Sequence, residues 1–206
     1  LDRPLFDPLS VGDGVAVEAI GRVLETTAMT LAAGDKDAHV GAGHVGREHA
    51  DAVIDADPMG VVEYGDAEAL TAAQAQRLFV ALERLAAENP RFMDWREYRA
   101  ASLVTPPLMA EVERVVRDPN AEFGLRALLL QQLKGAAIAE NLRQLLRQIM
   151  LDETQPYGIR QPSAMALVSI GGEDWSDLLE QLRCHAREDS LRLAHELLDD
   201  IGIETL

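Results

Sequence analysis

Three histidines near the start of the chain, His39, His44 and His49, are spaced five residues apart. Imidazole nitrogens bind transition metals, and metal-binding pairs on one helix are usually three or four residues apart. A spacing of five places successive side chains about 140° apart around a helix. The spacing therefore predicts a solvated loop with helix-terminal histidines. The alternative is a small helical metal-binding protein or enzyme that uses these three side chains.

The same segment contains Gly41, Gly43 and Gly46, which match the spacing G-x-G-x-x-G. In a dinucleotide-binding site this motif follows a buried strand and opens a helix. The residues before it here, "AAGDKDAH", are polar and end a helix rather than forming a strand. The glycines therefore predict a flexible loop, and we expect no cofactor.

Other reactive side chains lack the partners that catalysis requires. Glu173 and Asp174 are adjacent carboxylates, which in so acidic a chain are interpreted as a solvated helix start. Cys184 lies within an apolar helical pattern, which predicts a small buried side chain rather than a nucleophile. No serine follows an elbow motif with a placed histidine. We therefore expect no catalytic residue, no metal site and no enzymatic activity.

The composition indicates packed helices. Of the 206 residues, 48% are hydrophobic but only 4% are aromatic, so the core must consist of Leu, Ala, Val, Ile and Met. Alanine and leucine favour helices, whereas β-branched and aromatic residues dominate strands. The length allows one ordinary domain or two small ones. The expected fold class is all-α.

The charge balance excludes several partner classes. The formal net charge is -16, and Lys36 and Lys134 are the only lysines. A phosphate-binding surface needs clustered cations, so we expect no nucleic-acid partner. Anionic membranes are disfavoured for the same reason, and no apolar run is long enough to span a bilayer. A single cysteine fits a reducing compartment, so we expect a cytoplasmic protein. Because the chain begins with Leu1, it is expected to be part of a longer one.

Helix signals become regular from Thr71 onward. In the N-terminal part, 1–70, the expected elements are a helix over 11–33, a short helix over 45–56, and a connector, "MGVVEYGDAEALT", with a hint of strand in "VVEY". Thr71 and Gln74 have the spacing of a capping box, and the helix they begin should end near Asn89.

Beyond that helix the pattern predicts helices in pairs, with prolines at the joints. Pro106, Pro119 and Pro156 lie between predicted helices, where a missing amide hydrogen costs least. The region 71–206 is expected to form one series of hairpins. The predicted pairs are 95–104 with 107–117, 122–134 with 138–151, and 159–170 with 175–187, followed by a helix over 190–201.

A short sequence motif recurs along this region. Gly124-Leu125-Arg126 and Gly158-Ile159-Arg160 are 34 residues apart, and Ser190-Leu191-Arg192 follows 32 residues later. Self-similarity at this length indicates stacked helical hairpins that cannot bury their apolar faces alone. We expect the aliphatic residue of each copy to begin the apolar face. We expect each arginine to form a surface ion pair with an acidic turn, with a ligand-binding arginine row as the alternative.

The segments "DPMGVVEYGDAEALTAAQAQRLFVALERLAAENPRF", "EYRAASLVTPPLMAEVERVVRDPNAEFGLRALLLQQLKG" and "LDETQPYGIRQPSAMALVSIGGEDW" resemble a known group of proteins. The two-helix units resemble HEAT repeats. Residues 56–203 resemble the helical region that lies beyond the ATPase core of bacterial NACHT-type (STAND) proteins. That resemblance implies an α-solenoid with a less regular helical N-terminal part.

In that family the helical region is associated with sensing, autoinhibition and partner contacts, while a separate module handles the nucleotide. The present chain contains no G-x-x-x-x-G-K-[ST] phosphate loop, so no NTPase activity is implied. The expected function is protein recognition or scaffolding, as the sensor or regulatory part of a defence or signalling protein. The partner is expected to be a protein.

The metal alternative makes a direct prediction. Because the histidine spacing does not place ligands on one helix face, purified protein should contain less than stoichiometric zinc, nickel or copper by elemental analysis. Stoichiometric metal that disappears in a His44→Ala variant would establish the alternative instead.

Overall fold

A computed structural model describes residues 50–64, 67–89, 100–184 and 187–201 of the chain. These residues are mostly helical, and no strand occurs among them. The predicted all-α class is therefore confirmed for this part of the protein. The helix predicted over 11–33 and the glycine-rich segment after it lie outside the described residues.

The expected connector after Pro58 is helical. A helix over 50–56 is followed directly by α3 (Pro58–Tyr64) and the short 3₁₀ helix η1 (Ala67–Ala69). Pro58 is the first residue of α3, where its missing amide hydrogen has no helical acceptor to lose. Val62 is buried in the core. The hint of strand in "VVEY" was therefore wrong, because burial in a helical core determines the conformation of this short apolar run.

The predicted capping box at Thr71 is confirmed. Helix α4 (Ala72–Glu88) begins where the Thr71 side chain accepts a hydrogen bond from the Gln74 amide and the Gln74 side chain accepts one from the Thr71 amide. Two amide groups that have no partner inside the helix are thereby satisfied. Asn89 forms the C-cap at the predicted end, and the apolar stripe of Leu78, Phe79 and Leu82 is fully buried.

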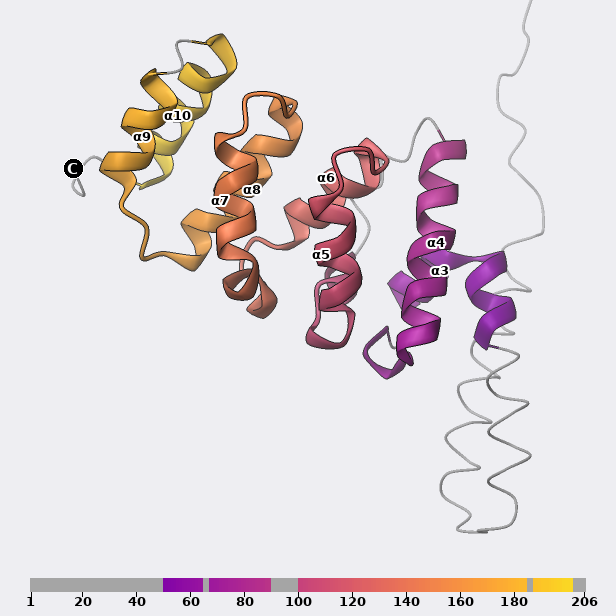
Figure 1. The fold of residues 1–206 in the computed structure, drawn as a ribbon. Coiled ribbons are helices and arrows are strands. Elements are labelled where there is room, and N and C mark those ends of the chain that lie inside the picture. Colours follow the sequence, from indigo (N-terminus) through magenta and orange to yellow (C-terminus); the bar gives the residue numbers. More distant parts are fainter. Residues whose placement is uncertain (1–49, 65–66, 90–99, 185–186, 202–206) are drawn as a thin grey trace, which may run out of the picture.

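Three helical hairpins follow. Their helices lie close to the predicted positions, but the predicted pairing was wrong by one helix. The helix over 143–151 was expected to pair with the helix before it, yet it packs against the helix after it, and the other pairs shift in the same way. Two of the hairpins are preceded by 3₁₀ turns, η4 (Pro106–Leu108) and η5 (Ala137–Leu142), and η3 (Ala100–Leu103) lies before the first. Figure 1 shows the turn within each hairpin at the same end of the molecule. The hairpins are α5 (Met109–Arg117) with α6 (Phe123–Gln132), α7 (Arg143–Leu151) with α8 (Tyr157–Ile170), and α9 (Trp175–Cys184) with α10 (Glu188–Ile201).

The second helices of the hairpins form the interior layer. Helix α8 packs against both α6 and α10, and each second helix also packs against the first helix of its own hairpin. Every residue from Gly124 to Leu130 of α6 is buried, and all of them except Arg126 are apolar. The apolar stripe predicted as core in α7 is also buried. That stripe comprises Leu142, Leu145, Leu146, Ile149 and Met150.

Glycines with positive φ end two segments. Gly171 has φ of 73° at the C-cap of α8, and Gly135 has φ of 79° in the turns after α6. Side chains rarely adopt this left-handed conformation, so glycine fits both positions.

Pro162 lies inside its helix. Because α8 begins at Tyr157, Pro162 is in the second turn and not the first. A proline there removes one helical hydrogen bond. The side chain is buried, so its packing helps to offset that loss.

The third copy of the recurring motif, Ser190-Leu191-Arg192, was assigned to the wrong register. Leu191 is 47% exposed and does not begin an apolar face, whereas Leu193 is fully buried, as Leu125 and Ile159 are. Leu193 is 34 residues after Ile159, the same interval that separates Ile159 from Leu125. The corresponding triplet is therefore the one centred on Leu193. Ala194 then occupies the position of the arginine.

Burial of Leu129 in α6 makes a stability prediction. Leu129→Asp should place an unpaired charge in the core and lower the free energy of unfolding by more than about 4 kcal/mol. Glu140→Ala removes an exposed partner of Arg143 and should cost less than about 1 kcal/mol. Urea unfolding followed by circular dichroism measures both, and equal midpoints for the two variants would show that the helix faces are assigned wrongly.

Candidate functional site

Two buried arginines connect the hairpins. Arg126 in α6 and Arg160 in α8 are 3% and 1% exposed, although a guanidinium group is among the most costly groups to remove from water. They are 34 residues apart and both occupy the fourth position of their helix. We call Arg126 and Arg160 the bridging arginines.

Each bridging arginine donates to two neighbouring segments. The Arg126 Nε donates to the carbonyl oxygen of Val116 in the last turn of α5 at 2.9 Å. Its Nη1 donates to the side-chain oxygen of Gln155, just before α8, at 2.5 Å. One side chain thus connects the first helix of its own hairpin to the turn of the next hairpin.

Arg160 repeats these contacts one hairpin later. Its Nε donates to the carbonyl oxygen of Met150 in the last turn of α7 at 2.8 Å, and its Nη2 donates to the Ser190 hydroxyl in α10 at 2.9 Å. Val116 and Met150 are themselves 34 residues apart. The carbonyl groups in the last turn of a helix lack helical partners and have partial negative charge, so they suit a buried cation.

The expected surface ion pairs are therefore wrong for Arg126 and Arg160. Burial lowers the pKa of both arginines from the usual value, and the carboxylates of the acidic turns oppose that shift. Asp118 and Asp152 act in this way on Arg126. The predicted acidic neighbours thus exist, but they act at longer range while backbone carbonyls make the direct contacts.

Arg192 is exposed and forms a surface ion pair, as predicted, but its partner lies within its own helix and not in an acidic turn. It forms an ion pair with Glu196 at 3.1 Å within α10, and its guanidinium lies over the Tyr157 ring at 4.3 Å from the centroid. Burial and the Glu196 carboxylate together raise the pKa of Tyr157 to about 12. Arg192 is 34 residues after Gly158, so it is not the third bridging arginine.

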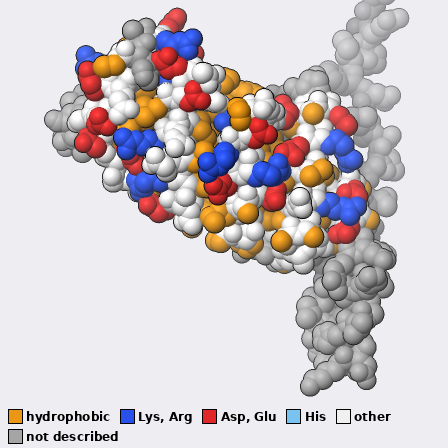
Figure 2. Space-filling view, viewed as in Figure 1, with side chains coloured by type: hydrophobic (Ala, Val, Ile, Leu, Met, Phe, Trp, Pro, Cys, Tyr) orange, Lys and Arg blue, Asp and Glu red, His pale blue; other side chains and the backbone are white. Residues whose placement is uncertain are grey.

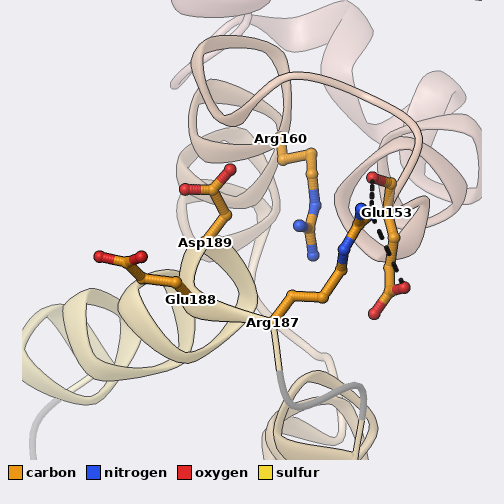
Figure 3. A pocket seen from close by; sticks show the side chains of 5 residues that line it. All are labelled: Glu153, Arg160, Arg187, Glu188 and Asp189. Atoms are coloured by element: carbon orange, nitrogen blue, oxygen red, sulfur yellow. Dashed lines mark hydrogen bonds and ion pairs between the residues drawn. The ribbon is translucent and has the colours of Figure 1, made fainter.

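A cavity of about 310 Å³ lies beside Arg160 at the junction of the last two hairpins. Figure 3 shows Arg160 between the two carboxylates at the start of α10 and the Arg187 and Glu153 side chains. Arg187 Nη1 donates to the Glu153 carbonyl oxygen at 2.8 Å and lies 3.9 Å from its Oε2. The lining residues are Glu153, Arg160, Arg187, Glu188 and Asp189.

This cavity is lined by three carboxylates and two guanidinium groups. Its lining consists of guanidinium and carboxylate side chains, without a hydroxyl, thiol or imidazole group that could act as a nucleophile or as a proton shuttle near neutral pH. Opposite charges lie close enough to compensate one another. Among the described residues, no group of three or more His, Cys, Asp and Glu side chains is placed to bind a metal ion.

Ion pairs cross the face formed by the first helices. Figure 2 shows blue and red side chains next to one another over this face. All of these pairs except that of Glu173 have both side chains at least partly exposed, and such pairs contribute about 0 to 1 kcal/mol each. The pairs are Arg77 with Asp51 and Asp55, Arg114 with Glu83, Arg143 with Glu173, and Arg147 with Asp177.

Glu173 was wrongly interpreted as solvated. Its side chain is only 5% exposed, and its Oε1 lies 2.7 Å from Arg143 Nη1. The same Arg143 nitrogen donates to the carbonyl oxygen of Gly171 at 2.7 Å, which connects α7 to the segment before α9. Asp174 does fit the prediction, because it is exposed and accepts a hydrogen bond from the Asp177 amide at 3.3 Å.

The prediction that Cys184 is buried was also wrong. The thiol is exposed at the end of α9 and donates to Glu180 at 3.5 Å, a contact that raises the pKa of Cys184. The buried face of α9 consists instead of Leu178, Leu179 and Leu182.

Several predicted groups cannot be placed in the site. His39, His44 and His49 lie outside the described residues, as do Gly41, Gly43 and Gly46. The buried Glu173 pair and the register of α10 were missed. The constant interval of 34 residues would have given the register.

Comparisons of the chain with models of protein families, with curated proteins and with solved structures found no match. No helix in the described part of the chain has the length and apolarity needed to cross a bilayer.

The bridging contacts predict unequal effects of two arginine substitutions. Arg160→Met should leave the Met150 carbonyl and the Ser190 hydroxyl buried without their donor, at a cost of about 1–3 kcal/mol. Arg192→Met removes exposed contacts and should cost less than about 1 kcal/mol. Urea unfolding gives both values, and a smaller effect at Arg160 than at Arg192 would contradict the structural role of Arg160.

Proposed function

We propose that this chain is a protein-recognition or scaffolding module without catalytic activity, built as an α-solenoid of HEAT-like hairpins. The observation that supports this most directly is the recurrence of the bridging contacts after 34 residues. Contacts that recur at one interval are expected when successive hairpins share the same relation to their neighbours. Such a series presents equivalent surface positions at regular spacing, which suits it to extended protein contacts.

Two further contacts recur at the same interval. Phe123 packs against Gly158, and Tyr157 packs beneath Arg192, so both residues of the second pair lie 34 positions after those of the first. The packing of α8 between α6 and α10 fits a solenoid in the same way. The cavity lining, which consists of carboxylate and guanidinium side chains, gives no support to a reaction.

We further propose that the module is the sensor or regulatory region of a bacterial STAND-type defence or signalling protein. The support is the resemblance of residues 56–203 to the helical region beyond the ATPase core of those proteins. In this proposal nucleotide chemistry belongs to another module, because the chain has no phosphate-binding loop of the P-loop type.

Photo-crosslinking in the source cells tests the recognition role. A photoreactive amino acid at Val80, Ser169 or Leu191, which are exposed positions on different parts of the surface, should capture one protein from at least one position. The Leu129→Asp variant with the same photoreactive group is the control for capture by unfolded chain. If no position captures a protein that the control fails to capture, the recognition role is wrong.

A further inference from the structure

Three large side chains line the end of the molecule where the hairpins turn. Phe123 is 41% exposed, Leu191 is 47% exposed and Tyr157 is partly exposed. They lie at the starts of α6, α8 and α10, and successive members are 34 residues apart. We call Phe123, Tyr157 and Leu191 the turn ridge. Exposed apolar residues that recur at equivalent positions of neighbouring elements are unlike the scattered ones found on most surfaces.

Contacts between neighbours show that the turn ridge is continuous. The Phe123 ring lies against Gly158, the residue after Tyr157, and the Tyr157 ring lies against Arg192, the residue after Leu191. Helices packed side by side have axes about 8–10 Å apart. The three positions are therefore spaced by about that distance, in the order in which the hairpins pack.

The exposed ring of Phe123 is held in place. A Cβ atom at Gly158 would lie 3.0 Å from the Phe123 Cζ, so glycine leaves room for the ring to lie against the backbone of α8. Tyr157 is held by Arg192 through a cation–π contact. Side chains that are already ordered lose little entropy on binding, and exposed but ordered aromatic residues are typical anchors of protein interfaces.

Carboxylates outnumber cations in the turns beside the turn ridge, while the Arg192 guanidinium lies over Tyr157 itself. The turns of the three hairpins contain more carboxylates than cations, and Arg187, one of the two cations, already contacts Glu153. The chain as a whole has a net charge of -16, which disfavours another copy or an anionic membrane as the occupant. The charged residues of the turns are Asp118, Glu122, Asp152, Glu153, Glu188 and Asp189, with Arg117 and Arg187.

We propose that the turn ridge binds a cationic amphipathic helix of a partner protein. Seven residues of α-helix rise about 10.5 Å, so apolar side chains at every seventh position match the spacing of the ridge. Lysine or arginine residues beside them would face the carboxylates of the turns. This inference rests on the proposed recognition function and adds to it the chemistry and location of the partner contact.

Synthetic helices test this chemistry directly. The probe is an 18-residue helical peptide with leucine on one face and lysine on the other. The matched control peptide has glutamate in place of lysine. Calorimetry with the whole chain should detect the lysine peptide alone, with affinity that falls as salt rises. Phe123→Ser and Leu191→Ser should each weaken binding at least tenfold. Val80→Ser, which replaces an exposed apolar residue on α4, should leave the affinity for the peptide unchanged.

Several results would overturn the inference. One is that the lysine peptide binds wild type and both ridge variants equally well. Another is that it does not bind wild type. Circular dichroism confirms that each variant is folded. Hydrogen exchange on wild type supplies a test without substitution, since bound peptide should protect 120–125, 155–160 and 190–195, and protection elsewhere only would contradict the site. A dimer of the free chain that dissociates in Leu191→Ser would assign the ridge to a second copy.

The recognition role can survive failure of this inference. A partner captured from Val80 or Ser169 but not from Leu191 would leave the proposed function intact and place the contact away from the turn ridge. Absence of specific capture from all three positions would reject both.

Discussion

The structure depends on a buried guanidinium group that needs acceptors on both sides of a hairpin junction. Arg126 and Arg160 lose nearly all contact with water. Each donates hydrogen bonds to a carbonyl oxygen in the last turn of one helix and to a side chain near the start of the second helix of the next hairpin. An unsatisfied buried donor costs more than a satisfied one contributes. The neighbouring hairpin must therefore lie where its acceptor reaches the arginine, which restricts how two hairpins can pack.

This restriction has consequences at the surface. When successive hairpins meet in the same way, residues that begin their second helices become neighbours, as Phe123 and Gly158 do, and as Tyr157 and Arg192 do. The proposed recognition surface is thus a result of the packing that the bridging arginines direct. Ala194 occupies the corresponding position in α10, so α10 does not extend this contact to a further hairpin.

Local signals predicted the helices, while depth of burial had to come from the structure. The Thr71 capping box and the glycine at Gly171 depend on nearby residues, so their roles could be recognised in the sequence. The role of Arg160 depends on a carbonyl ten residues away and a hydroxyl thirty residues away, and acidic neighbours in the sequence suggested a surface pair instead. Glu173 and Cys184 were misjudged for the same reason. The spacing of apolar residues along a helix does not show which residues at its two ends are covered by neighbouring segments.

A double-mutant cycle between Arg160 and Ser190 tests the central claim most directly. The two side chains belong to different hairpins and meet at 2.9 Å, so Arg160→Met and Ser190→Ala should be coupled. The account predicts that the double variant loses less stability than the sum of the single variants, with a coupling free energy of about 0.5–3 kcal/mol. Additivity within about 0.3 kcal/mol would show that this contact does not join the hairpins energetically, and would contradict the account.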